Sequence, residues 1–180
     1  MLTFEKAMEL TRTVSSNTAF EDDECKLYFD LLLCIPKHGL AVEVGLEYGR
    51  SSSIALQVAQ DVGFDYIGID TFEGNPDAQK SWAKMAEPFA KFVYVQKSVT
   101  VSGIGSIDAI LIDGDHSFQG VLDDCNHFEP MMAEGAFMMF HDYGRESLPE
   151  VQRAVDMFFL HRKGWFHYAH FGTLKVFRKI

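Results

Sequence analysis

Ile107-Asp-Ala-Ile-Leu-Ile-Asp113-Gly-Asp115-His116 is an apolar run that ends abruptly in two carboxylates and an imidazole. A continuous apolar run is typical of a parallel strand that is covered on both faces. In open α/β sheets such strands deliver polar groups to a crevice at their carboxyl ends. The segment therefore predicts a buried strand over 107–113, with candidate site residues directly after it.

A second segment repeats this pattern further along the chain. Ala136-Phe-Met-Met-Phe140 is continuously apolar and is followed at once by His141 and Asp142. If the two strands are neighbours, their ends lie about 5 Å apart, so side chains from both can reach one cation or one substrate hydroxyl. The two segments together predict an active site at one edge of a sheet.

Strand and helix patterns alternate on both sides of these two segments. Residues 3–14 and 21–35 have the apolar spacing of helices. The elements predicted after them are strand 41–45, helix 51–61, strand 66–70, helix 76–86, strand 92–96, strand 107–113, helix 118–132, strand 136–141 and helix 148–161. Such alternation implies right-handed crossovers and an open parallel sheet.

The end of the chain breaks this alternation. Residues 165–171 and 173–177 are aromatic and β-branched segments separated by Gly172, which predicts a closing antiparallel hairpin. The fold class is therefore α/β, with three layers and a mostly parallel sheet. We expect one domain over residues 1–180, in which 1–38 form a helical lid and 39–180 a Rossmann-like core.

Composition excludes several classes of protein. The formal net charge of −10 disfavours nucleic acid as a partner, because nucleic-acid binding draws its affinity from clustered Lys and Arg. The three cysteines lack the CxxC spacing of a structural zinc site, and no segment has the length of a membrane span or the pattern of a signal peptide. We expect a cytoplasmic protein with reduced thiols and no membrane partner.

The turn after the first strand of the core contains two glycines, in Val42-Glu43-Val-Gly45-Leu-Glu47-Tyr-Gly49-Arg-Ser51. Glycines here let a ligand approach the backbone without meeting a Cβ atom. A dinucleotide fingerprint requires glycines at relative positions one, three and six, but the last two positions hold Glu47 and Arg50. The glycine spacing therefore disfavours NAD. Glu47 would also place negative charge near a pyrophosphate, whereas a cofactor with cationic groups and no phosphate would tolerate the acidic turn, and Glu43 could help to hold its cationic part.

Asp70 ends the next predicted strand, where doubly wound folds place the carboxylate that accepts the ribose hydroxyls of a cofactor. The simpler alternatives are a turn tightened by glycine and an aspartate that caps a turn. The order of the two motifs along one chain favours the cofactor site.

Taken together, four motifs resemble those of the class I S-adenosylmethionine-dependent methyltransferases, in the compact branch with the macrocin-type sugar O-methyltransferases. The motifs are the glycine turn 42–51, Ile69-Asp70-Thr71-Phe-Glu-Gly74, Ile112-Asp113-Gly-Asp115-His116-Ser-Phe118 and Phe140-His141-Asp142-Tyr143. The resemblance implies a seven-stranded sheet with six parallel strands and an antiparallel seventh.

The resemblance also assigns roles to residues. Glu43, Gly45 and Gly49 would surround the methionine end of S-adenosylmethionine, and Asp70 would hold its ribose. The other residues placed in the cofactor site are Glu47, Ser51, Thr71, Ser98, Asp113 and His116. By the same resemblance, Asp113, Asp142 and His141 would hold Mg²⁺, as the corresponding residues do in metal-dependent members. His116 would act as general base, and His116 and Asp113 are the predicted catalytic residues.

These assignments are chemically sensible, because a hydroxyl becomes nucleophilic when a metal lowers its pKa or a base removes its proton. Alternatives stay open at several positions. Asp115 or Ser117 could be the N-cap of the following helix, and His141 could be a hydrogen-bonded core histidine. In metal-free relatives similar acids only hold water or orient the substrate.

The resemblance implies an O-methyltransferase for a small-molecule acceptor, with a sugar hydroxyl or a vicinal diol favoured. Residues 97–106 are too short and too rich in glycine for a full crossover helix, which leaves Ser98 a weak candidate for a cofactor contact. The segments that would cover the acceptor are also short, so a homodimer partner could complete the acceptor pocket. The alternative functions are a non-catalytic or degenerate binding domain of the same fold and, less favoured, an NAD or nucleotide-sugar oxidoreductase.

Overall fold

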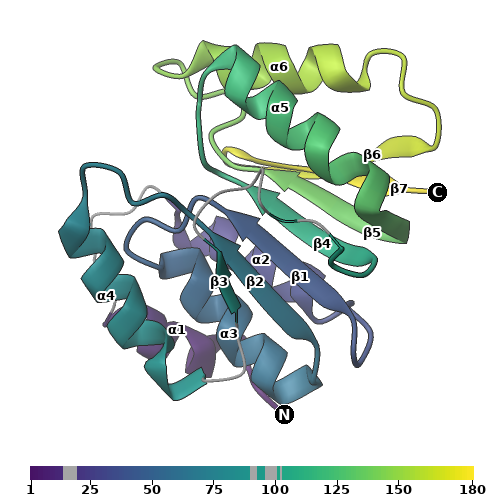
Figure 1. Cartoon of the computed structure of the whole chain (residues 1–180). Coiled ribbons are helices and arrows are strands. Elements are labelled where there is room, and N and C mark those ends of the chain that lie inside the picture. Colours follow the sequence, from purple (N-terminus) through teal and green to yellow (C-terminus); the bar gives the residue numbers. More distant parts are fainter. Residues whose placement is uncertain (14–19, 90–92, 96–100, 102) are drawn as a thin grey trace.

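A mixed β-sheet runs through the molecule, with helices on both of its faces (Figure 1). The computed structural model describes residues 1–13, 20–89, 93–95, 101 and 103–180. Within these residues the sheet has seven strands in the order β3-β2-β1-β4-β5-β7-β6. The strands are β1 (Leu40–Val44), β2 (Asp65–Ile69), β3 (Val93–Val95), β4 (Ile107–Ile112), β5 (Met132–Phe140), β6 (Trp165–Phe171) and β7 (Leu174–Lys179).

Helices connect most of these strands. They are α1 (Phe4–Thr11), α2 (Asp22–Leu32), α3 (Arg50–Val62), α4 (Pro76–Ala86), α5 (Phe118–Phe128) and α6 (Pro149–Phe159), with short 3-10 helices at η1 (Glu87–Phe89) and η3 (Glu129–Met131). No helix in the described ranges is both long enough and apolar enough to cross a bilayer.

The strand directions confirm the α/β class and the closing antiparallel hairpin. β1 pairs in parallel with β2 and β4, and the same direction continues to β3 and β5. β7 runs antiparallel to both β5 and β6. Because the strand order reverses between β1 and β4, their carboxyl ends flank the crevice where ligands bind in such sheets.

Alternate strand residues face the two helical layers. Ala41, Leu111 and Met139 belong to the core that the sheet forms with α1, α2 and α3. Val42 and Phe140 belong to the opposite core, which the sheet forms with α5 and α6. Because successive strand side chains point to opposite faces, Asp113 and His141 continue the alternation of Leu111 and Met139 toward the α1–α3 layer.

The two N-terminal helices pack on α3. The hydroxyls of Thr11 and Ser53 are 2.6 Å apart in a buried contact, and Gln57 Nε2 donates to the Ala7 carbonyl at 3.1 Å. Further along, Arg50 Nε donates to the Phe20 carbonyl at 2.6 Å. The first segment of the chain is thus part of one helical layer, and its action as a lid stays a prediction.

Two predicted boundaries around β5 were wrong. The helix predicted over 118–132 ends at Phe128, because Pro130 lacks an N–H and disfavours helical conformation in the residue before it. The strand predicted over 136–141 begins at Met132, which pairs with Ile107 before the register shifts. Gly135, with φ of 79°, lies in this irregularity, which interrupts the apolar pattern that marks the rest of the strand.

Candidate functional site

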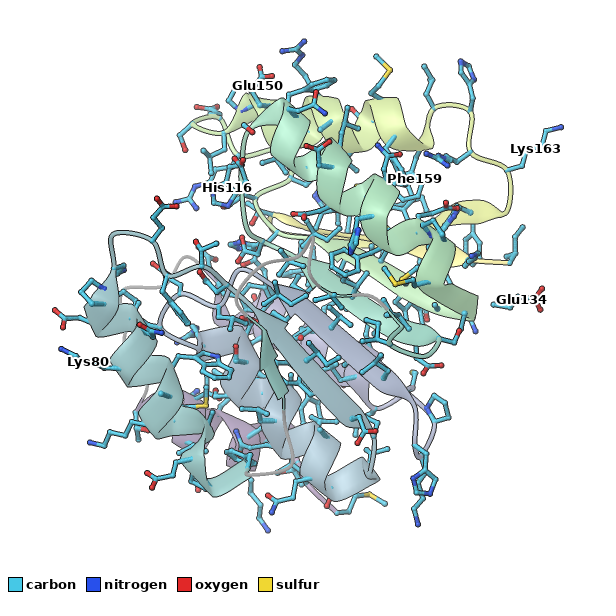
Figure 2. All side chains as sticks on the ribbon, viewed as in Figure 1. Lys80, His116, Glu134, Glu150, Phe159 and Lys163 are labelled. Atoms are coloured by element: carbon cyan, nitrogen blue, oxygen red, sulfur yellow. The ribbon has the colours of Figure 1, made fainter. Side chains whose placement is uncertain are left out.

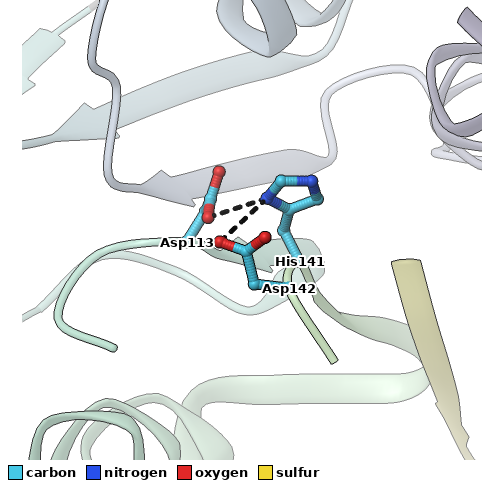
Figure 3. A group of neighbouring side chains, drawn as sticks. All are labelled: Asp113, His141 and Asp142. Carbon is cyan, nitrogen blue, oxygen red and sulfur yellow. Dashed lines mark hydrogen bonds and ion pairs between the residues drawn. The ribbon is translucent and has the colours of Figure 1, made fainter. Parts of the chain in front are cut away.

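The ends of β4 and β5 bring two carboxylates and two imidazoles together, and Figure 3 shows three of these side chains, those of Asp113, His141 and Asp142. His141 Nδ1 lies 3.0 Å from Asp113 Oδ1 and 3.7 Å from Asp142 Oδ2. His116 Nε2 lies 3.4 Å from Asp113 Oδ1 and 3.3 Å from Asp142 Oδ2. We call these four residues the acid–imidazole cluster.

Electrostatic pairing dominates the ionisation of the cluster. Burial by itself would raise the pKa of Asp113, but hydrogen bonds to His116 and His141 outweigh it and lower that pKa. The contact with Asp113 raises the pKa of His116. Burial alone would lower the pKa of His141, but Asp113, Glu24 and Asp142 outweigh it and raise the pKa to about 10. The contacts between Asp113 and the two imidazoles therefore favour the ionised forms of all three groups.

A backbone turn in the left-handed region points Asp142 back into the cluster. Asp142 has φ of 58°, a conformation that costs a non-glycine residue of the order of 1–3 kcal/mol and is often found at functional sites. Arg145 Nη1 donates to Asp142 Oδ1 at 2.7 Å, which leaves Oδ2 toward His116. Arg145 thus helps to orient this buried carboxylate.

His116 is the more accessible imidazole of the cluster. Its side chain is 37% exposed, whereas that of His141 is 3% exposed. Figure 2 shows His116 and Glu134 at opposite ends of the sheet, consistent with His116 following β4 and Glu134 lying near the start of β5. His116 can therefore exchange a proton with a bound ligand.

The N-cap alternative is confirmed for Ser117. Its hydroxyl accepts from the backbone N–H of Gly120 at 3.1 Å at the start of α5. Asp115 Oδ1 accepts from the Ser117 N–H at 2.8 Å, so its carboxylate stabilises the same turn. Of the polar residues in this motif, Asp113 and His116 join the cluster and the other two organise the helix start.

Both glycines of the turn after β1 have left-handed backbone conformations, and Gly45 is also crowded by the backbone of Asp113. Gly45 has φ of 88°, and a Cβ atom there would lie 2.0 Å from the carbonyl oxygen of Asp113. Gly49, with φ of 85°, precedes α3, and a Cβ atom there would lie 2.7 Å from Met85 Cε and 3.0 Å from Trp82 Cδ1. Their contact with a cofactor stays a prediction.

Asp70 lies beside this glycine turn and organises its backbone. Its Oδ2 accepts from the N–H groups of Leu46 at 2.7 Å and Glu47 at 3.2 Å, and its Oδ1 accepts from Phe72 N–H at 2.6 Å. Burial, followed by the charges of Asp113 and Asp70, raises the pKa of Glu47. Glu47 therefore lies close to two other acids at the carboxyl edge of the sheet.

Three other predicted cofactor residues, Glu43, Ser51 and Thr71, make contacts within the protein, and their contact with a cofactor stays a prediction. Glu43 is wholly buried, and Ser51 donates to its Oε1 at 2.5 Å. Both residues lie beneath the glycine turn, because the inward face of β1 packs on the start of α3. Thr71 is exposed and its Oγ1 accepts from Glu73 N–H at 3.3 Å within a turn.

The remaining predicted cofactor residue, Ser98, lies outside the described residues. The segment 97–106 is described only at 101 and 103–106, where no helix is assigned. The expected absence of a full crossover helix therefore stays a prediction for residues 97–100 and 102.

Two residues missed by the sequence analysis touch the cluster. Arg145 pairs with Asp142 from the loop after β5. Glu24 of α2 places Oε2 3.5 Å from His141 Nε2. The only sequence signal for Glu24 is its spacing from Glu21, which is that of a capping box and indicates a helix start rather than a site.

The cluster has the chemistry of a divalent cation site. One donor atom each from Asp113, His141 and Asp142 lies within 4.8 Å of the others. Carboxylate oxygens suit Mg²⁺, and the imidazole nitrogen suits transition metals such as Mn²⁺ and Fe²⁺. The residues present therefore fit a cation held by two acids and one histidine.

Comparison with known proteins gives a family match and several structural matches. A family model described as a methyltransferase domain matches residues 42–143, which include both glycines, Asp70 and the whole cluster. A search of curated proteins by sequence found no match.

Many solved structures are similar in fold, and three of them illustrate the likeness. Cofactor-bound Rv0187 from MTB has a TM-score of 0.73 at 13% identity, over 97% of this chain and 88% of its own. An O-methyltransferase from Bacillus cereus in complex with SAH has a TM-score of 0.71 at 11% identity, over 98% and 90%. CalS11, a TDP-rhamnose 3'-O-methyltransferase of calicheamicin biosynthesis, has a TM-score of 0.68 at 12% identity, over 97% and 92%. Each likeness extends over nearly the whole of both chains.

Proposed function

The chain belongs to the methyltransferase domain family and has the fold of S-adenosylmethionine-dependent enzymes, and from this premise we propose that it methylates a hydroxyl group of a small molecule. The observation that carries the proposal is the acid–imidazole cluster, which lies next to the glycine turn where the ends of β1 and β4 meet. This arrangement provides a base and a candidate cation site beside the crevice of the fold.

The charge of the site supports S-adenosylmethionine as donor. Glu47, Asp70, Asp113 and Asp142 place carboxylates along one edge, and the pKa of Glu47 is raised by burial and by its acidic neighbours. The donor carries a sulfonium and an ammonium group and no phosphate, so both of its cations would lower the repulsion among these acids. A pyrophosphate cofactor would increase the repulsion.

The proposed reaction is an in-line transfer. The hydroxyl oxygen of the acceptor forms a bond to the methyl carbon while the carbon–sulfur bond breaks and its electron pair stays on sulfur. His116 takes the hydroxyl proton, and the carboxylates of Asp113 and Asp142 beside Nε2 stabilise the resulting imidazolium. A divalent cation bound by Asp113, His141 and Asp142 would lower the pKa of the acceptor hydroxyl.

A sugar hydroxyl or a vicinal diol is the proposed acceptor. The sequence resemblance to sugar O-methyltransferases favours it, and one of the similar structures is a TDP-rhamnose 3'-O-methyltransferase. Two adjacent hydroxyls can also coordinate one cation together, which suits a site with few protein ligands. A homodimer that completes the acceptor pocket stays a prediction.

The proposal is tested first by binding and then by transfer. We expect calorimetry to detect S-adenosylmethionine binding, and radiolabelled methyl transfer to at least one member of a panel of sugars, nucleotide sugars and catechols. If a cation assists, EDTA will lower the rate and added Mg²⁺ or Mn²⁺ will restore it. No donor binding would refute the proposal, and binding without transfer to any acceptor would favour the non-catalytic alternative.

A further inference from the structure

Glu24 is a buried acid in the first turn of α2 whose carboxylate is surrounded by donors. The residue is 2% exposed. Its Oε1 accepts from Thr173 N–H at 2.6 Å and from Thr173 Oγ1 at 2.9 Å, and its Oε2 accepts from Glu21 N–H at 2.8 Å. Burying an ionised carboxylate is costly unless it is hydrogen-bonded, so these contacts fix its position.

The same Oε2 faces the far side of the His141 ring. It lies 3.5 Å from Nε2, while Nδ1 on the opposite side lies 3.0 Å from Asp113 Oδ1. His141 Nε2 is fully buried and makes no conventional hydrogen bond to any described residue. Among the described residues, Glu24 is the acid within ion-pair distance of this otherwise unsatisfied nitrogen, since the acids of the cluster lie on the Nδ1 side.

Close packing holds both side chains in this arrangement. A Cβ atom on Gly172 would lie 2.6 Å from Glu24 Oε1, so the hairpin turn leaves no space for the carboxylate to retreat in that direction. The Phe20 ring lies 5.0 Å from the His141 ring between centroids. Tyr143 N–H donates to the Thr173 carbonyl at 3.0 Å, which ties the same turn to the residue after Asp142.

We propose that Glu24 is a positioning residue that holds the Nε2 edge of His141 and thereby directs Nδ1 at Asp113 and Asp142. The contact resembles the way in which histidine ligands of metal sites give their second ring nitrogen to a carboxylate, which sets both the tautomer and the ring orientation. The Glu24 side chain then links helix α2 and the β6–β7 turn to the acid–imidazole cluster. The catalytic importance of this coupling rests on the proposed function.

The experiment compares histidine side-chain spectra of the whole chain and of Glu24→Gln. Glutamine has nearly the same size and can still accept from Thr173, but it lacks the negative charge that faces Nε2. With ¹⁵N-labelled histidine in EDTA, and with the His141→Gln spectrum to assign the signal, we expect the Nε2 resonance of His141 to move. The resonances of His38 and His127, which lie far from Glu24, should keep their positions. In a transfer assay we expect kcat to fall about 10- to 100-fold, with little change in the KM for the donor.

Two further variants separate positioning from loss of structure. Glu21→Ala removes the side chain that accepts from the Glu24 N–H, which weakens the start of α2 but leaves the Glu24 carboxylate intact. We expect its His141 resonances to match the unmodified protein. Gly172→Ala pushes on the carboxylate without removing its charge, so it should move the Nε2 resonance even if Glu24→Gln does not fold.

The proposal is overturned if both Glu24→Gln and Gly172→Ala, where they fold, leave the Nε2 resonance in place. It is also overturned if Glu21→Ala moves that resonance as much as they do. The spectra require no donor, acceptor or metal. A shifted resonance in a protein that transfers no methyl group would therefore support the positioning role and refute the proposed function.

Discussion

Replacing Glu43 with glutamine tests whether the buried acid beneath the glycine turn makes stability depend on pH. Glu43 is fully buried, and its carboxylate accepts hydrogen bonds from Ser51 at 2.5 Å, Ser52 at 3.1 Å and Tyr66 at 2.7 Å. Burial raises the pKa of Glu43 from 4.5 to about 7. The hydrogen bonds from the three hydroxyls act in the opposite direction but do not outweigh burial. Glutamine has nearly the same shape and cannot ionise.

The sign of the effect follows from the raised pKa. Below pH 4.5 the glutamate is protonated in both states, so the stabilising effect of its raised pKa is fully present. Between 4.5 and about 7 the unfolded chain releases this proton while the folded protein keeps it, so stability falls as pH rises. The difference between these two pKa values corresponds to a loss of about 3 kcal/mol in unfolding free energy. The loss is complete once the pH is above the pKa of the folded protein.

The assay is urea unfolding of both proteins at intervals from pH 4.5 to 8.5. Other groups also titrate in this range, so the quantity compared is the difference in unfolding free energy between the two proteins. Across this pH range we expect the unfolding free energy of Glu43→Gln to rise by about 3 kcal/mol relative to that of the unmodified protein. Most of this change should occur below pH 7.5. Glu134→Gln, at an exposed acid near the start of β5, controls for the loss of one negative charge.

A difference between Glu43→Gln and the unmodified protein that stays constant with pH would refute the reasoning. It would mean that the hydroxyls of Ser51, Ser52 and Tyr66 stabilise the carboxylate as well as water does. A difference of the opposite sign would mean that they stabilise it better, and that Glu43 stays ionised throughout.

Three other substitutions test the site and the turn. Asp70→Ala should weaken S-adenosylmethionine binding by roughly 1 to 3 kcal/mol through lost charged hydrogen bonds, and unchanged affinity in calorimetry would remove Asp70 from the cofactor site. His116→Ala should lower the rate of methyl transfer about 100-fold while donor affinity stays nearly the same, and an equal rate would reject His116 as the base. Gly45→Ala should cost about 2 to 5 kcal/mol of unfolding free energy, because its Cβ meets a backbone carbonyl in a left-handed conformation. Gly144→Ala is the matched control, since Gly144 has φ of 80° and no atom within 4 Å of the added Cβ; an equal cost in both would show that backbone strain alone is responsible.

Much of the fold could be predicted from local sequence because each element carries its own signal. Helix α4 begins at Pro76 after Asn75, whose side chain accepts from Ala78 N–H, and both boundaries match the prediction. The hairpin of β6 and β7 was recognised by its aromatic and β-branched segments around Gly172. The start of β5 was missed because the residues that precede Ala136 pair irregularly and lack the apolar pattern of a buried strand.

The site could be predicted only in part. Asp113 and His141 each follow an apolar strand, and the carboxyl ends of parallel strands meet at one edge, so their meeting follows from the topology. The topology alone does not show which residues of a motif lie at the rim of the sheet and which lie beneath it. Glu43 and Ser51 belong to the glycine-turn motif, but their side chains meet each other in the core.

The chain's own pattern of apolar runs and turn residues was sufficient for the α/β class, the hairpin and the edge that holds the polar residues, because short-range periodicity and capping encode these features. Only the tertiary structure decided that Glu24 contacts both His141 and Thr173, which lies 149 residues further along the chain. It also decided that Ser117 caps α5 while His116 faces the acids. Side-chain direction and long-range packing decide such contacts, and neither leaves a periodic trace in the sequence.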